Sequence, residues 1–249
     1  MSQISAVVIT YNEESNIGSC VTALQKVAAE VLIIDSNSTD KTRMIAKKLG
    51  AKVVETKWRG YAATKNFGNR IALNDWILSI DTDEILSEEL IESIKALDLD
   101  EQKVYALDRL TNFCGQWIKH SGWYPEWKVR LFHRSHSKWE GKFVHERLVH
   151  RNRVSVQKVK GKLLHYSYKT LEDHRERIEN YARLSALEMQ SEGKQSSFIK
   201  LWISPAFRFI KTFFLKMGFL DGKNGWVISV RNASLVHLKY RILRDLNRR

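Results

Sequence analysis

Residues 76–84 constrain the fold of this chain more than any other stretch. The segment begins with five residues that are apolar except for Ser79, which is typical of a strand buried in a sheet covered on both faces. Two carboxylates, Asp81 and Asp83, follow at once. Because open α/β sheets bind ligands beyond the carboxyl ends of their strands, we expect these acids at a ligand-binding edge.

The spacing of Asp81 and Asp83 predicts a divalent metal site. Carboxylates this close repel each other unless a cation lies between them, and Mg²⁺ and Mn²⁺ are the ions that suit oxygen ligands. The same residues also fit a solvated turn whose acids precede a helix beginning near Ser87. The spacing alone leaves both interpretations open.

Strand and helix patterns alternate over the first hundred residues. Short β-branched or apolar runs lie at 4–10, 31–35, 53–55 and 76–81, and residues with helical spacing lie between them. This order predicts an α/β fold with a largely parallel sheet and right-handed crossovers. No G-x-G-x-x-G motif follows the first strand, which argues against a dinucleotide site.

Charge divides the chain into two parts. Residues 1–114 hold 13 of the 41 basic and 17 of the 28 acidic residues, so this part has a net charge of −4 and the remainder has +17. The second part therefore favours an anionic partner such as lipid, nucleic acid or a phosphorylated substrate. The two cysteines are far apart and no signal peptide is visible, so we expect a cytoplasmic protein without disulfides.

Four motifs in order resemble the family 2 glycosyltransferases of GT-A fold. They are residues 7–14 (VVITYNEE), 34–40 (IDSNSTD), 65–66 (KN) and 81–83 (DTD). Later segments are similar to the branch that adds glucose to the inner core of lipopolysaccharide. These are residues 123–127 (WYPEW), 130–132 (RLF), 144–146 (VHE) and 220–222 (LDG).

The resemblance implies a Rossmann-like GT-A domain over residues 1–168, with a nucleotide-binding half to about 110 and an acceptor half over 111–168. A basic helical extension would follow over 169–249. It further implies metal-dependent, inverting transfer of a hexose, with glucose as the choice, from a UDP-sugar to a lipopolysaccharide inner-core acceptor.

The resemblance also implies roles for single residues on the donor side. Asp35 would accept a hydrogen bond from uracil, although it also fits a helix or turn cap. Lys65 would meet the diphosphate, with Arg59 as a competitor and a solvated helix face as the plain alternative. The full nucleotide-sugar set is Thr10, Tyr11, Glu13, Asp35, Lys65, Asp81 and Arg130.

For the metal, the resemblance implies Mn²⁺ or Mg²⁺ held by Asp83, with Asp81 near the ribose or in the outer shell of the ion. His145 is a possible third ligand, and equally an ordinary strand histidine. For the general base we choose Glu126, with Glu146 as the alternative. Many relatives carry a Glu-Asp pair at this point, whereas this chain has Glu126 alone. We expect the neighbouring aromatic residues to raise the pKa of Glu126.

Residues 198–220 mix aromatic side chains with Lys200, Arg208, Lys211 and Lys216. The cations and Pro205 argue against a membrane-spanning helix and favour a helix lying in the membrane interface. The aromatic residues also fit a packed subdomain or a dimer contact. Thr170 and Asp173 predict a capping box that begins an earlier helix.

We therefore expect a peripheral protein on the cytoplasmic face of the inner membrane, acting on a lipid-linked glycan. A polyprenyl phosphate or another cell-envelope glycan is the alternative acceptor. A non-enzymatic protein that binds nucleotides or nucleic acid is the alternative of another class, and it is disfavoured because no nucleic-acid module is recognisable.

Overall fold

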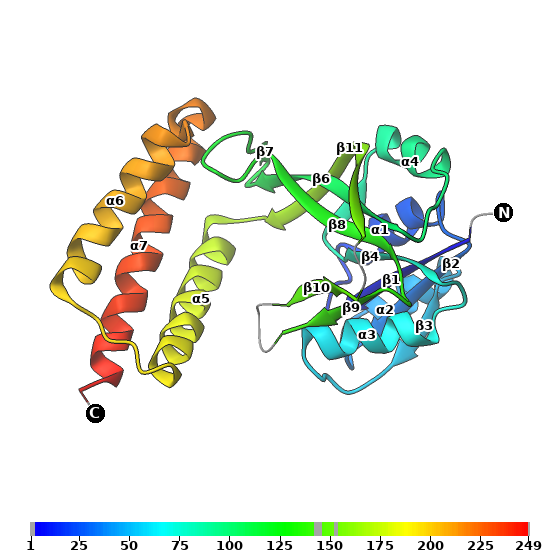
Figure 1. Ribbon diagram of the computed structural model, residues 1–249, viewed down its shortest axis with the longest axis horizontal. Coiled ribbons are helices and arrows are strands. Elements are labelled where there is room, and N and C mark those ends of the chain that lie inside the picture. The colour runs from blue at the N-terminus through cyan, green and yellow to red at the C-terminus, as the bar shows by residue number, and fades with distance from the viewer. Residues whose placement is uncertain (1–2, 142–145, 152–153, 249) are drawn as a thin grey trace. The chain divides into compact units, whose positions relative to one another are not determined.

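The computed structural model describes residues 3–141, 146–151 and 154–248, and it confirms the expected α/β fold. Figure 1 shows the order of the elements along the chain. The strands are β1 Ile4–Thr10, β2 Glu30–Asp35, β3 Lys52–Glu55, β4 Trp76–Asp81, β5 Glu84–Leu86, β6 Lys103–Phe113, β7 Gln116–Trp117, β8 Glu126–His133, β9 Ser137–Glu140, β10 Arg147–His150 and β11 Ser155–Tyr168. The helices are α1 Ile17–Leu24, α2 Thr42–Lys48, α3 Tyr61–Ile71, α4 Glu88–Lys95, α5 Leu171–Ser191, η1 Ile199–Ile203, α6 Ser204–Ile210, η2 Lys211–Leu215, η3 Gly218–Asp221 and α7 Gly222–Leu246.

The main sheet is mixed. Within the described residues its order is β3-β2-β1-β4-β8-β6-β11-β5, with β7 paired to β6. The first four strands are parallel, as the alternating pattern predicted, and β8 continues the sheet antiparallel to β4. Strands β9 and β10 form a separate hairpin.

Helices cover both faces of the parallel strands, and this explains why these strands are almost wholly apolar. Alternate residues of β1, such as Ala6 and Val8, join a core cluster with α1, α2 and α4. Val7 points to the other face, where α3 packs. At Gly68 in α3 an added Cβ would lie 2.5 Å from a methyl group of Val7, so only glycine allows this close approach of helix and sheet. This close contact between α3 and the sheet also positions Lys65, which lies less than one turn before Gly68 in the same helix.

Compact packing divides the chain into two units. The first unit contains Met1–Arg109 and Glu126–His165, and the second contains Leu110–Pro125 and Tyr166–Arg249. The second unit thus includes residues 110–125, most of which lie in the stretch 111–168 that we expected to form the acceptor half. Asp221 explains this, because its carboxylate accepts hydrogen bonds from the Lys119 and His120 backbone N–H groups (both 3.1 Å) and from the Ser121 hydroxyl (2.7 Å).

The second unit is built around α5, α6 and α7, and Figure 1 shows α6 running beside α7. Helix α5 begins with the predicted capping box, in which Thr170 and Asp173 each bond the other's backbone N–H. No helix in the described part of the chain is both long enough and apolar enough to cross a membrane.

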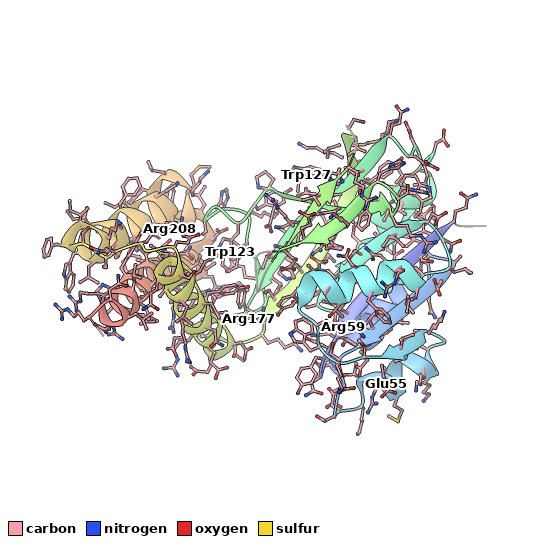
Figure 2. All side chains as sticks on the ribbon, turned by 60° about the horizontal axis from the view of Figure 1, so that its bottom comes forward. Glu55, Arg59, Trp123, Trp127, Arg177 and Arg208 are labelled. Carbon is pink, nitrogen blue, oxygen red and sulfur yellow. The ribbon has the colours of Figure 1, made fainter. Side chains whose placement is uncertain are left out.

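His174 of α5 is buried among aromatic rings in this second unit. Its ring lies 4.9 Å from that of Phe113 and 4.6 Å from that of Tyr168, measured between centroids, and Trp123 closes a third side at 6.1 Å. Figure 2 labels Trp123 and Arg177, whose guanidinium lies 5.2 Å from the Tyr168 ring. Burial, with the charges of Arg231 and Arg177, lowers the pKa of His174 to about 4.

This environment predicts that the protein loses stability in mild acid. An unfolded histidine takes up its proton near pH 6.5, whereas folded His174 stays neutral until about pH 4. The contribution of neutral His174 to the free energy of unfolding is therefore fully present above pH 6.5. It is lost between pH 6.5 and 4, and the total loss is about 3 kcal/mol. We expect His174→Phe to flatten this part of the curve of melting temperature against pH. An unchanged slope in the variant would contradict the assignment.

Candidate active site

Neighbouring parallel strands bring the predicted donor residues to one edge of the sheet. In the register, Thr10 at the end of β1 is opposite Asp35 at the end of β2. On the other side of β1, Ile9 is opposite Asp81 at the end of β4. The first unit thus gathers Thr10, Asp35 and Asp81 at the carboxyl edge, where α/β sheets bind their ligands.

The loops after β1 and β2 hold each other in place. Asn12 has a positive φ of 53° and donates its backbone N–H to the Ser38 hydroxyl (2.9 Å). Its side-chain oxygen Oδ1 accepts a hydrogen bond from the Thr39 backbone N–H (2.8 Å). The fully buried Asp35 carboxylate accepts from the Ser38 N–H (2.9 Å) and hydroxyl (2.5 Å). Arg43 Nε lies 3.8 Å from the same carboxylate, so Asp35 has a turn-stabilising role.

The other residues of these loops differ in exposure. Tyr11 is 58% exposed, and the Glu13 carboxylate accepts a 2.7 Å hydrogen bond from the Asn16 amide. The hydroxyl of Thr10 is buried, with no hydrogen-bond partner among the described residues. A buried hydroxyl without a hydrogen-bond partner costs folding free energy. The position of this hydroxyl at the carboxyl edge of the sheet therefore favours a ligand site there.

Asp81 lies between two cations. Lys65 Nζ is 3.0 Å from its Oδ1, and Arg130 Nη2 is 2.7 Å from its Oδ2. Burial alone would raise the pKa of Asp81, but Arg130 and Lys65 together hold it well below its usual range. Each carboxylate oxygen thus has a cationic partner, and these partners favour the ionised form of Asp81.

Lys65 and Arg130 are both buried, and each contacts a second carboxylate. Lys65 lies 3.4 Å from Glu146 and 4.5 Å from the centroid of the Trp139 ring. Arg130 lies 2.6 Å from Glu84, whose carboxylate also accepts from the Asp81 N–H (3.1 Å). Burial would lower the pKa of Arg130, but Asp81 and Glu84 raise it above its ordinary value.

Arg59, the competitor of Lys65, is placed differently. Its guanidinium lies 5.3 Å from the centroid of the Phe67 ring. Figure 2 labels Arg59 beside α3. Of the two cations, Lys65 is therefore the one that contacts Asp81.

His165 was missed by the sequence analysis. Its Nε2 lies 3.3 Å from Asp83 Oδ2. Strand β11 pairs antiparallel with β5 so that His165 is opposite Glu84, one residue after Asp83. This pairing of distant segments leaves no local signal in the sequence. His145, the histidine that the sequence suggested, lies outside the described residues.

Glu126 begins β8 and forms ion pairs with two cations. Arg109 Nη2 lies 2.7 Å from Glu126 Oε2, and Lys128 Nζ lies 2.9 Å from Oε1. Burial would raise the pKa of Glu126, but Arg109 and Lys128 together lower it. The expectation that aromatic neighbours raise this pKa is therefore wrong, because two cations occupy the carboxylate that the aromatic rings were expected to desolvate. Glu146, the alternative base, instead faces Lys65.

The donor atoms at this edge suit a divalent cation. Asp83 has the carboxylate oxygens that suit Mg²⁺ and Mn²⁺, and the imidazole of His165, a common metal ligand, lies 3.3 Å from it. Each oxygen of Asp81 already forms an ion pair, with Lys65 or with Arg130, which makes this carboxylate the weaker candidate ligand. Two protein ligands leave coordination positions for the oxygens of a diphosphate, as Mg²⁺ commonly requires.

Comparison with known proteins identifies the family of this chain. The model of the glycosyl transferase family 2 matches residues 5–152. An uncharacterized glycosyltransferase of Rickettsia typhi is 30% identical over 99% of this chain and 88% of its own length. The lipopolysaccharide core biosynthesis glycosyltransferase LpsC of Rhizobium meliloti is 26% identical over 95% of this chain and 93% of its own.

A solved structure is also similar in part. Glucosyl-3-phosphoglycerate synthase of Mycobacterium tuberculosis, in complex with Mn²⁺, UDP and glucosyl-3-phosphoglycerate, covers 44% of each chain at 23% identity with a TM-score of 0.37.

The class of protein is therefore a glycosyltransferase with an α/β fold of GT-A type. The chain belongs to glycosyl transferase family 2.

Proposed function

We propose that this glycosyltransferase transfers glucose from UDP-glucose, with inversion, to a heptose of the lipopolysaccharide inner core. The observation that carries the proposal is the edge at which Asp35, Asp81 and Asp83 meet a buried lysine and a histidine. Similarity to LpsC along almost the whole chain supports the choice of acceptor. The reaction would take place at the cytoplasmic face of the inner membrane, where a lipid-linked acceptor is presented.

On the donor side, the carboxylate of Asp35 accepts from the N3–H of uracil, and Lys65 supplies positive charge to the diphosphate. Asp81 orients Lys65 through their 3.0 Å contact and lies next to the ribose. The residues proposed to surround the nucleotide-sugar are Thr10, Tyr11, Glu13, Asp35, Lys65, Asp81 and Arg130.

The proposed metal site consists of Asp83 and His165, with Asp81 outside the coordination sphere. A bound Mn²⁺ or Mg²⁺ would neutralise negative charge on the departing diphosphate. The ion pair of Asp81 with Arg130 and Lys65 then keeps that carboxylate from competing for the same ion. His165 is preferred to His145 because it lies within 3.3 Å of Asp83.

On the acceptor side, Glu126 takes the proton of the attacking hydroxyl. The oxygen of that hydroxyl forms a bond to the anomeric carbon as the bond from this carbon to the UDP oxygen breaks, and the proton stays on the glutamate. The carboxylate is ionised at neutral pH and can accept this proton, although its lowered pKa makes it a weaker base than an ordinary glutamate. Arg109 fixes its orientation through a 2.7 Å contact.

The test of the function is an assay with radiolabelled UDP-glucose and matched acceptors. We expect metal-dependent transfer to heptose-terminated lipopolysaccharide cores and none to polyprenyl phosphate. Transfer to polyprenyl phosphate alone would show that the lipid phosphate, and not the lipopolysaccharide core, is the acceptor. Absence of donor hydrolysis with either Mn²⁺ or Mg²⁺ would refute the metal-dependent mechanism. UDP-galactose serves as the matched control donor, because it differs from UDP-glucose only in the configuration of one hydroxyl.

Glu126→Gln is expected to lower kcat by about 10²- to 10⁴-fold, because the amide cannot accept the hydroxyl proton. The matched variant is Glu146→Gln, which alters a carboxylate beside Lys65 and should change KM for the donor more than kcat. Both are measured by steady-state kinetics at saturating metal. If the two variants exchange these phenotypes, Glu146 is the base.

A further inference from the structure

A stripe of apolar side chains along the helical segment 198–216 is exposed to water. Its members lie three or four residues apart, so they share one face of the helix. They are Ile199 (61% exposed), Ile203 (54%), Phe207 (59%), Ile210 (48%) and Phe214 (55%). Isolated exposed apolar residues are common, but a continuous row of this kind marks an interaction site.

The stripe is not the face that packs against the rest of its unit. The opposite face carries Leu201 and Thr212, which are about 95% buried. The Leu201 carbonyl lies 3.0 Å from Nδ1 of His237 in α7, and the Phe213 ring packs edge-on against Trp226 at 5.4 Å. Because α7 already covers that side, the stripe faces away from it.

Cations lie beside the stripe, and acidic residues are absent from this segment of the sequence. Lys200, Arg208, Lys211 and Lys216 are all exposed, and no Asp or Glu occurs between Glu192 and Asp221. Figure 2 labels Arg208 on α6. Lys200, Arg208 and Lys211 each directly follow a member of the apolar row in the sequence. An apolar row with flanking cations is typical of helices that lie in a lipid interface.

We propose that this apolar–basic face, formed by the five stripe residues and the four cations, docks on a bilayer that contains anionic lipids. The helix would lie in the plane of the interface, with its apolar row among the acyl chains and its cations at the headgroups. A second copy of the chain fits less well, because a symmetric contact through this face would place cations against cations. This inference concerns a surface outside the transfer site.

The inference is tested by co-sedimentation of the full chain with vesicles. We compare phosphatidylcholine alone with phosphatidylcholine containing phosphatidylglycerol, at low and high salt. Wild-type protein should sediment with the anionic vesicles and be released by salt. Lys200→Ser with Lys211→Ser should weaken this binding by about twentyfold. Phe207→Ser with Ile210→Ser should weaken it by more than about tenfold on the same vesicles.

Matched controls carry the same chemistry on the first unit. Leu73→Ser removes a side chain of a residue that is 74% exposed, and Lys47→Ser with Lys48→Ser removes two exposed cations. These variants should bind vesicles like the wild type, and circular dichroism checks that every variant is folded.

Two results would overturn the inference. One is wild-type protein that stays in the supernatant with anionic vesicles, or stripe variants that sediment unchanged. The other is a dimer, seen by light scattering without lipid, that Phe207→Ser with Ile210→Ser dissociates, which would assign the face to a second copy. Neither readout involves donor or acceptor, so failure here is distinct from failure of the proposed reaction.

Discussion

Asp83→Ala is expected to lower turnover by about a thousandfold or more while leaving the fold intact. Asp83 follows β4 at the edge of the sheet and lies 3.3 Å from His165, so its loss removes half of the proposed protein ligands. Stabilising the charge on a leaving diphosphate is worth several kcal/mol, which corresponds to this factor in rate. The measurement is kcat with UDP-glucose across a range of Mn²⁺ concentrations, together with Mn²⁺ affinity by calorimetry.

His165→Ala is the companion variant, and it should weaken Mn²⁺ affinity in the same direction. Lys162→Ala, three residues earlier on β11, provides the control, because Lys162 pairs with Asp108 rather than with the acids after β4. Turnover like that of the wild type in Asp83→Ala would refute the metal role, and unchanged metal affinity in His165→Ala would remove only the histidine from the site.

Arg130→Met is expected to destabilise the protein by about 3–5 kcal/mol. Arg130 is 5% exposed and contacts both Asp81 (2.7 Å) and Glu84 (2.6 Å), and Glu84 is itself only 1% exposed. Removing the guanidinium leaves these carboxylates crowded. Among the described residues, Lys65 still contacts Asp81, and Arg109 lies 3.3 Å from Glu84. The free energy of unfolding is measured by urea titration followed by circular dichroism.

Two further variants separate charge from packing in this network. Adding Glu84→Gln to Arg130→Met should recover part of the lost stability, because it removes one uncompensated buried charge. Lys128→Met, next along β8 but 42% exposed at its side chain, breaks a pair with Glu126 and should cost less than about 1 kcal/mol. Equal losses from Arg130→Met and Lys128→Met would show that the buried network contributes little.

Much of the fold could be predicted from local patterns. The central parallel strands β1, β2 and β4 are mainly apolar runs near the lengths the structure shows, because strands covered on both faces are mainly apolar. Thr10, Asp35 and Asp81 follow such runs, so parallel pairing necessarily gathers them at one edge. The capping box at Thr170 was equally readable, since both partners lie within one helical turn.

The contacts that these residues make with distant parts of the chain could not be predicted from local patterns. Glu126 could be recognised as an acid near aromatic side chains, but the sign of its pKa shift depends on Arg109, which pairs with it across β6 and β8. Residues 111–125 were expected in the acceptor half, and no local pattern records their hydrogen bonds with Asp221 of the second unit.

The amino-acid order alone therefore determined the strand–helix alternation, the acidic edge and the amphipathic character of residues 198–220, since each depends on neighbours within a few positions. Only the tertiary structure placed His165 beside Asp83, surrounded Asp81 with Lys65 and Arg130, and chose which face of the 198–216 helix stays exposed. Antiparallel pairing and helix packing decide these contacts, and both join segments tens of residues apart whose register no local pattern records.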